Sequence, residues 1–251
     1  MTAPAPGPKT PRPCSGGRRL AERLFVILAV PCAVLFCVVA GPARSQVAVS
    51  ATLTSNYLYR GMSLSDGQPT LDLALAVDGR GGLYGGVSLI GETARNGRPR
   101  WLGDVEYLGY ATRLGGGPTL DLGVHNLDYR TFGYCSGDYD EAEVYAGLIA
   151  GHFNAYVHYS PNAFNPGART IYAEANGAIG LPRPFRLVAH AGVVTPLGGG
   201  LDRYDVSAGV AAAFRRAEAR LTWTTTRPNT DYATRFATGR GVVALALTWL
   251  F

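Results

Sequence analysis

The sequence predicts an all-β protein: a transmembrane, antiparallel up-and-down barrel of about twelve strands. Three observations predict it. Apolar residues alternate with a period of two through most of the chain, short and long connections follow one another in strict alternation, and the last strand ends on an aromatic residue. Side chains alternate across a strand, so such a pattern gives each strand one apolar face and one mixed face.

The C-terminal stretch 241–251 carries the clearest alternation. One face is strongly apolar, and the other is smaller and mildly polar; the apolar face holds Val243, Leu245, Leu247, Trp249 and Phe251. A chain that ends in this way resembles the C-terminal targeting strand of bacterial outer-membrane barrels. Phe251, Trp249 and Leu247 are therefore the predicted assembly signal, read by the barrel-assembly machinery. The alternative is an ordinary core strand at a C-terminus.

The N-terminus predicts export. Three arginines, Arg18, Arg19 and Arg23, precede an apolar run over 24–40, and small residues follow to Ser45. This is the order of a signal peptide, with cleavage expected after Ser45. A membrane anchor is the rival interpretation, but the run is shorter than the ~20 residues that a spanning helix needs. We expect a signal peptide over 1–45 and a single barrel domain over 46–251.

Removal of 1–45 changes the charge argument. The whole chain has 23 basic and 18 acidic residues, of which 1–45 holds six and one, leaving 17 of each. A neutral mature chain lacks the basic patch of a nucleic-acid binder, so no nucleic-acid partner is expected. Of the four cysteines, only Cys135 remains, which excludes an internal disulfide.

The connections between predicted strands indicate a barrel more clearly than the strands do. Strands are predicted at 47–59, 70–77, 83–91, 101–114, 119–129, 141–150, 153–159, 170–180, 185–195, 204–216, 218–226 and 241–251. Every second connection is a short turn, and the others, at 60–69, 92–100, 130–140, 160–169, 196–203 and 227–240, are longer. Short turns on one rim and longer loops on the other are typical of outer-membrane barrels, whereas Greek-key sandwiches have no reason to alternate. An even strand count places both termini on the short-turn, periplasmic side.

For a membrane barrel, the apolar face points to lipid and the mixed face lines the lumen. The candidate pore-lining charges are Asp72, Asp104, Glu106, Asp121, Glu143, Glu174, Arg186, Asp205, Glu218 and Arg220. Acids outnumber bases in this set, so an open lumen would favour cations or sugars over anions. The alternative is that the charges pair across the lumen and plug it, and a twelve-stranded barrel is compatible with both.

Aromatic residues near the strand ends favour a membrane over a soluble barrel, because aromatic girdles mark the lipid interfaces. The candidates are Tyr57, Tyr59, Trp101, Tyr129, Tyr159, Tyr204, Trp223 and Trp249.

Several segments are similar to one known family. Residues 54–63 (TSNYLYRGMS) and 65–69 (SDGQP) resemble the opening of the TorF-like family of proteobacterial porins, and the Arg-Gly-Met-Ser segment is the most specific part. Residues 82–87, 143–148 and 158–162 also resemble that family, and the likeness runs across 46–251. The resemblance implies an outer-membrane barrel assigned to transport, with no defined substrate and no defined catalytic residues.

An enzyme is the main alternative. His158 and Ser160, with Glu174 on the next strand, are the residue types of a serine hydrolase, and the fragment is faintly similar to outer-membrane lipid A deacylases. Their common parity faces the lumen, whereas an acyl chain would approach from the lipid, and no nucleophile turn is present. The four histidines lie on separate segments without metal-ligand spacing, so neither a metal site nor a cofactor is expected.

These observations together predict an outer-membrane porin, not an enzyme, that lets small polar or cationic solutes diffuse. Its expected partners are outer-membrane lipid, the assembly machinery and small solutes. The alternatives are a lipid-directed enzyme and a plugged structural or adhesive barrel.

Overall fold

The computed structural model describes residues 46–132, 135–164, 167–227 and 241–251. The predicted signal peptide and most of the last long connection lie outside these residues. The elements are β1 (Gln46–Thr54), β2 (Leu58–Tyr59), β3 (Met62–Ser63), β4 (Thr70–Asp78), the 3-10 turn η1 (Arg80–Gly82), β5 (Leu83–Thr93), β6 (Pro99–Arg113), β7 (Thr119–Phe132), β8 (Cys135–Ala150), β9 (Phe153–Ser160), β10 (Thr170–Gly180), β11 (Phe185–Pro196), β12 (Arg203–Phe214), β13 (Ala217–Arg227) and β14 (Val242–Leu250). Across these ranges, no helix has the length and apolar character needed to span a membrane.

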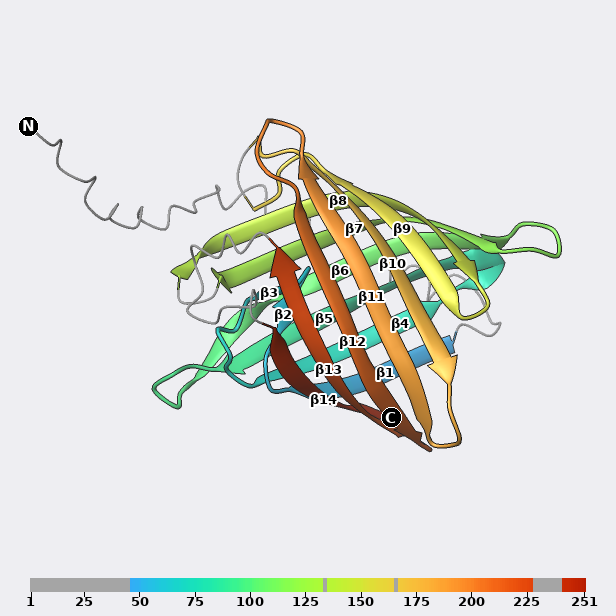
Figure 1. Cartoon of the computed structure of the whole chain (residues 1–251), viewed down its shortest axis with the longest axis horizontal. Helices are drawn as coiled ribbons and strands as arrows, with labels where there is room; N and C mark the ends of the chain where they lie inside the picture. The colour runs from blue at the N-terminus through green and yellow to red at the C-terminus, as the bar shows by residue number, and fades with distance from the viewer. Residues whose placement is uncertain (1–45, 133–134, 165–166, 228–240) are drawn as a thin grey trace, which may run out of the picture.

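Twelve strands close into one antiparallel barrel in the order β1-β14-β13-β12-β11-β10-β9-β8-β7-β6-β5-β4 (Figure 1). Each strand pairs with its neighbours in sequence, and β1 closes the cylinder by pairing with β14, where Ser50 lies opposite Leu250 and Thr54 opposite Ala246. The backbone amide of Phe251 continues this pairing by donating to the carbonyl of Val49 at 3.0 Å. Closure leaves no free sheet edge, which an open twelve-stranded meander would expose. The predicted fold class is confirmed.

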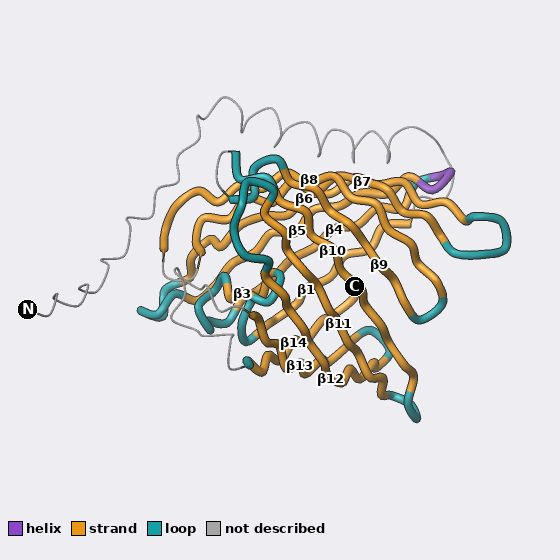
Figure 2. Tube along the Cα trace, turned by 45° about the horizontal axis from the view of Figure 1, so that its top comes forward, coloured by secondary structure: helices purple, strands orange, loops and turns teal. Residues whose placement is uncertain are grey.

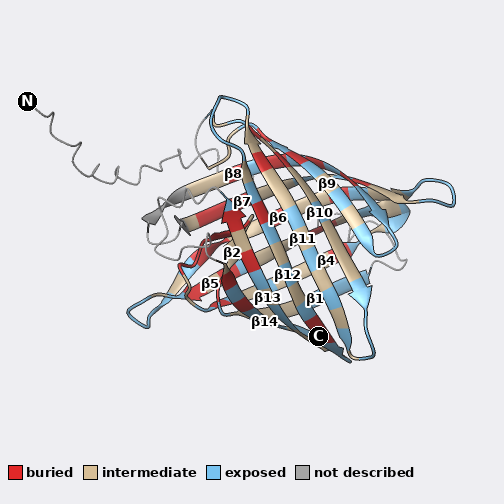
Figure 3. Cartoon of the chain, viewed as in Figure 1, coloured by how far each residue is buried: buried red, intermediate tan, exposed pale blue. Residues whose placement is uncertain are grey.

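The strand faces follow the alternation in the sequence. In β8, residues 141, 143, 145 and 147 are buried while 142, 144, 146 and 148 are exposed. The exposed sets of the strands are largely apolar and form the outer surface of the cylinder (Figure 3), as with Val144 and Leu148 of β8 and Leu247, Trp249 and Phe251 at the C-terminus. The opposite faces point into the lumen.

The first strand is shorter than the sequence predicts. A single strand was expected over 47–59, but β1 ends at Thr54 and the chain turns into the lumen at Asn56. The side-chain carbonyl of Asn56 accepts hydrogen bonds from the hydroxyls of Ser63 and Ser65, at 2.6 and 3.2 Å. It also accepts one from the amide of Gly67 at 3.2 Å. These bonds tie the two ends of an inward loop together and explain why the strand stops.

Residues 55–69, which contain β2 and β3, form a hairpin inside the barrel, here named the lumen hairpin (Figures 1 and 2). Leu64 is fully buried within it and packs in an apolar cluster with four residues of the inner wall: Ile90, Leu102, Leu127 and Tyr129. This cluster is the core of the described residues. It places the root of the lumen hairpin against β5, β6 and β7.

Candidate functional site

The tip of the lumen hairpin is a two-residue turn, Arg60-Gly61, between Tyr59 and Met62. Arg60 has φ of +47° and Gly61 has φ of +72°, so both central residues occupy the left-handed region. This is the backbone of a type I′ turn, whose twist matches that of the two strands it joins. The turn projects the Arg60 side chain toward the wall of the barrel.

Arg60 forms a buried ion-pair cluster with two glutamates of β8. Its Nη2 donates to both carboxylate oxygens of Glu143, at 2.6 and 2.7 Å, and its Nη1 donates to Oε1 of Glu141 at 3.5 Å. The guanidinium also lies 4.1 Å from the ring centroid of Tyr172 on β10, a cation–π contact. At most 7% of each of the three charged side chains is exposed. Burial of this kind makes the pairing costly to break from one side.

Gly61 touches the far side of the barrel. The hydroxyl of Thr226 on β13 donates to the carbonyl of Gly61 at 2.8 Å. A Cβ added at Gly61 would lie 2.2 Å from Thr226 Oγ1 and 2.7 Å from the Cβ of Asp205 on β12. The lumen hairpin therefore reaches from β5–β7 at its root to β8, β12 and β13 at its tip. Only a segment that crosses the lumen can make both sets of contacts.

The root of the lumen hairpin is held by aromatic and polar contacts. Tyr57 and Tyr129 share a hydrogen bond between their hydroxyls at 3.2 Å, and nearer the tip Tyr59 donates to Glu141 at 3.1 Å. Burial raises the pKa of Tyr57 to about 12, so this hydroxyl stays protonated at neutral pH. Near the rim, Arg95 of the β5–β6 connection pairs with Asp66 at 2.5 Å. The hairpin is thus tied at its root as well as at its tip.

Beside the tip, histidines and carboxylates alternate around the inner wall from β8 to β12. His158 Nδ1 lies 3.4 Å from Glu143 Oε2, and its Nε2 lies 3.7 Å from Glu174 Oε1. Glu174 Oε2 lies 3.7 Å from His190 Nδ1, and His190 Nε2 lies 3.2 Å from Asp205 Oδ1. The result is a continuous row of titratable groups at the level of the hairpin tip.

Nearer the short-turn rim, tyrosines hold Asp121 and arginines hold Glu218. Tyr84 and Tyr156 each donate to a different oxygen of Asp121, at 2.6 and 2.9 Å. Arg186 of β11 and Arg220 of β13 both pair with Glu218. These two groups are part of the lining below the hairpin.

Eight of the ten candidate pore-lining residues occupy the inward strand faces: Asp72, Asp121, Glu143, Glu174, Arg186, Asp205, Glu218 and Arg220. Asp104 and Glu106 do not. They share a face with Leu89 and Val87 of β5 and with Asp128 and Asn126 of β7, and this is the outer face.

The prediction for Asp104 and Glu106 is wrong because of a β-bulge in β6. Ile90 pairs with Gly103, but the next residue, Gly91, pairs with Trp101, so that Leu102 is an extra residue. A bulge of this kind reverses the parity of the strand beyond it. Arg100 and Leu102 point inward before the bulge, and Val105 and Tyr107 point inward after it. A strictly alternating interpretation of the sequence places the acids on the wrong face.

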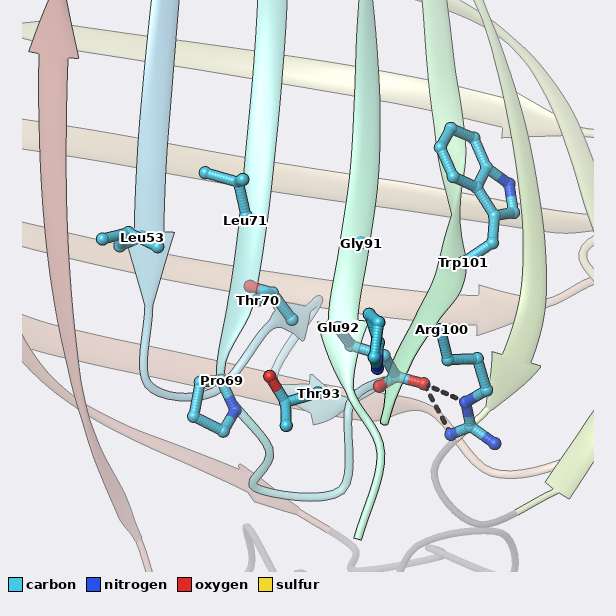
Figure 4. A pocket seen from close by; sticks show the side chains of 10 residues that line it. Leu53, Pro69, Thr70, Leu71, Gly91, Glu92, Thr93, Arg100 and Trp101 are labelled. Carbon is cyan, nitrogen blue, oxygen red and sulfur yellow. Dashed lines mark hydrogen bonds and ion pairs between the residues drawn. The ribbon is translucent and has the colours of Figure 1, made fainter. Parts of the chain in front are cut away.

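Asp104 and Glu106 instead belong to the outer wall. The side-chain amide of Asn126 donates to Glu106 at 3.2 Å. Glu106, Val124, Val144 and Tyr159 line an outer groove of about 400 Å³. A second outer groove of about 400 Å³ lies at the ends of β4, β5 and β6, beside Leu53, Leu71 and Trp101 (Figure 4). Behind it, on the inward face, Arg100 donates to Glu92 at 2.6 Å.

The aromatic residues predicted to form girdles likewise lie on both sides of the barrel wall. Trp101, Tyr159, Tyr204, Trp223 and Trp249 are exposed on the outer wall. Tyr57, Tyr59 and Tyr129 instead pack around the lumen hairpin.

Sequence reasoning missed the residues that matter most to the lumen. Arg60 was expected in an external loop, and Glu141 was not among the candidates. His125, on β7, lies directly opposite Glu143 on β8, although the two are far apart in the sequence. The apolar content of 57–64, unusual for a solvated loop, was the signal that could have indicated an inward hairpin.

Comparisons with known proteins agree with this architecture. A chain described under "Unveiling the Mechanism Behind the in-meso Crystallization of Membrane Proteins" is 10% identical, with a TM-score of 0.51 over 83% of each chain. The KdgM porin is 6% identical, with a TM-score of 0.50 over 81% of this chain and 99% of its own. At these identities the likeness shows the fold alone, which is that of a porin-like outer-membrane barrel. No curated protein matches the sequence.

A family model described as "Bacterial protein of unknown function (Gcw_chp)" matches residues 40–249, which is most of the chain. The chain therefore belongs to the Gcw_chp family of bacterial proteins.

Proposed function

We propose that this protein is an outer-membrane porin whose lumen is narrowed by its own lumen hairpin, and that it admits small polar or cationic solutes. One observation carries the proposal. The hairpin crosses the lumen, and the ion pairs of Arg60 with Glu141 and Glu143 hold its tip against β8. An inward segment held at its tip by polar contacts narrows the lumen and so restricts passage by size, and displacement of that tip would widen the lumen.

The charges of the lining support a preference for cations. Several inward acids, among them Asp72 and Glu174, form none of the arginine ion pairs described above. The inward arginines Arg60, Arg186 and Arg220, in contrast, each pair with a glutamate. Fixed negative charge in a low-dielectric channel raises the local cation concentration. Anions are therefore expected to pass less readily than cations of the same size.

The sequence resemblance to the TorF-like porins supports the same proposal. Its most specific segment, 60–63, is the tip of the lumen hairpin, so the resemblance falls on the structural feature that would control passage. We also propose outer-membrane lipid and the assembly machinery as partners, and cleavage of a signal peptide after Ser45. The exposed apolar face that ends at Phe251 supports the lipid contact.

The geometry favours a porin over a lipid-directed enzyme. His158 lies between Glu143 and Glu174 rather than beside a nucleophile. Ser160 Oγ accepts a hydrogen bond from the amide of Asn162 at 3.3 Å, and both His158 and Ser160 are buried on the lumen side. An acyl chain in the membrane would meet the opposite face of β9.

Single-channel recording tests the proposal. The chain 46–251, refolded and inserted in a planar bilayer with unequal salt on the two sides, is expected to give discrete steps. The reversal potential is expected to have the sign of cation preference. An inserted barrel that stays electrically silent would instead support a plugged structural barrel, and a reversal potential of the opposite sign would contradict the charge argument.

A further inference from the structure

The strongest cluster of unexplained groups lies in the lumen beside the hairpin tip. His125 of β7, Glu143 of β8 and His158 of β9 each present one donor atom, and all three atoms lie within 4.8 Å of one another. The three strands are adjacent in the barrel, and all three side chains point inward. From this arrangement we infer that the lumen holds a binding site for a divalent transition-metal cation, made by these three residues.

The separations suit a metal with short bonds. Two ligand atoms at about 2.1 Å from a tetrahedral zinc ion lie about 3.4 Å apart. His158 Nδ1 is 3.4 Å from Glu143 Oε2, and His125 Nδ1 is 4.0 Å from the same oxygen. The His125 side chain is 29% exposed, which leaves room for the ring rotation that closer ligand spacing requires. Two imidazoles and a carboxylate are ligands that zinc and its neighbours in the first transition row accept.

A second observation points to a ligand at the same place. His158 is 7% exposed, yet neither of its ring nitrogens makes a well-formed hydrogen bond within the described ranges, because the carboxylates of Glu143 and Glu174 are too distant or misaligned. Buried polar groups nearly always form well-made hydrogen bonds, so a buried imidazole whose nearest carboxylate oxygens lie at 3.4 and 3.7 Å requires an explanation. His190 gives the contrast, because its nitrogens contact Asn176 at 2.7 Å and Asp205 at 3.2 Å.

Glu174 completes the surroundings of His158. A metal-binding histidine usually donates its second N–H to a carboxylate, which orients the ring. Glu174 Oε1 lies 3.7 Å from His158 Nε2, on the side of the ring away from Glu143. The ring of Tyr145 lies 4.5 Å from that of His125 and 5.6 Å from that of His158, centroid to centroid, and restricts both imidazoles.

The site is connected to the lumen hairpin through Glu143. Arg60 donates to both oxygens of that carboxylate, so a bound cation and the guanidinium share it. Two positive groups that bind one carboxylate each lower the other's affinity for it, and this coupling is the same in both directions. A bound metal is therefore expected to loosen the hairpin tip, and loss of Arg60 is expected to tighten metal binding. The inference depends on the proposed function only in requiring that ions reach the lumen.

Zinc titration of the full folded chain in detergent micelles, followed by calorimetry, tests the inference. We expect one saturable site, at least a tenfold loss of affinity in His125→Gln and in His158→Gln, and tighter binding in Arg60→Ala. His152→Gln is the matched control, because His152 is exposed on the β8–β9 turn. The cobalt-loaded wild type is expected to show the absorption bands of a site with nitrogen ligands, and both glutamine variants are expected to lose them.

Two results would overturn the inference. These are the absence of saturable binding by the folded wild type, or unchanged affinity in both His125→Gln and His158→Gln. If His158→Gln fails to fold, the less buried His125→Gln decides alone. A barrel that binds zinc but never conducts would refute the proposed function and leave the metal site standing. A barrel that conducts but does not bind zinc would refute the metal site and leave the proposed function standing.

Discussion

Replacement of Arg60 by alanine is expected to release the tip of the lumen hairpin from β8. The guanidinium makes two short hydrogen bonds to Glu143 and a longer one to Glu141, with all three side chains buried. Removal of one partner from a buried ion pair costs ~3–5 kcal/mol. Water can enter the lumen once the tip leaves, which lowers the cost of the unpaired carboxylates. We therefore use the lower limit of about 3 kcal/mol, which is roughly a 150-fold change in the ratio of docked to released hairpin.

The assay is the occupancy of conductance levels in single-channel records. Release of the tip widens the path, so the Arg60→Ala barrel is expected to spend more time in a higher conductance level than the wild type. Arg98→Ala is the matched control, since Arg98 carries the same charge on the exposed β5–β6 connection. Arg60→Lys keeps the charge but loses the two-pronged geometry, and an intermediate occupancy is expected.

A clear result would refute this reasoning. If circular dichroism shows a folded Arg60→Ala barrel whose step sizes and level occupancies equal those of the wild type, the ion pair does not hold the hairpin in the conducting path. A change of the same size in Arg98→Ala would show that net charge alone is responsible.

Three further predictions follow from the same geometry. Gly61→Ala should displace the tip and raise the occupancy of the higher conductance level, because the added methyl overlaps Thr226 Oγ1 at 2.2 Å and φ is +72°; unchanged records would contradict this contact. Deletion of Phe251 should lower the amount of heat-modifiable barrel in outer-membrane fractions, since the residue ends the exposed face of β14, and normal amounts would count against an assembly role. Glu143→Lys and Glu174→Lys should each shift the reversal potential toward anions; a shift in neither would argue that the lumen is closed to ions.

The barrel itself was predictable from the sequence because each strand pairs with its neighbour in the chain. Alternation places Leu247 and Trp249 on one face, and the turn lengths then fix which rim each connection occupies. Both inferences use local information only. The strand order and the closure of the barrel follow from them without any knowledge of long-range contacts.

The lumen was not predictable in the same way, because its contents depend on contacts between distant segments. The extra residue at Leu102 reverses one strand, and only the pairing of Ile90 with Gly103 reveals it. His125 and Glu143 meet because their strands are in register, which neither local sequence indicates. The row of histidines and carboxylates is a property of the assembled cylinder.

The two halves of the lumen hairpin differ in what holds them, and under the proposed function this difference limits how the channel can open. The root buries Leu64 against Ile90 and Leu127, and exposure of that apolar surface to a water-filled lumen is unfavourable. The tip is held by polar contacts, from Arg60 and Tyr59 to the glutamates of β8 and from Thr226 to Gly61, which water or a cation can replace. The tip is therefore the part that moves while the root stays docked. A widening of the path near β8 and β13, rather than ejection of the whole hairpin, is the opening that this structure permits.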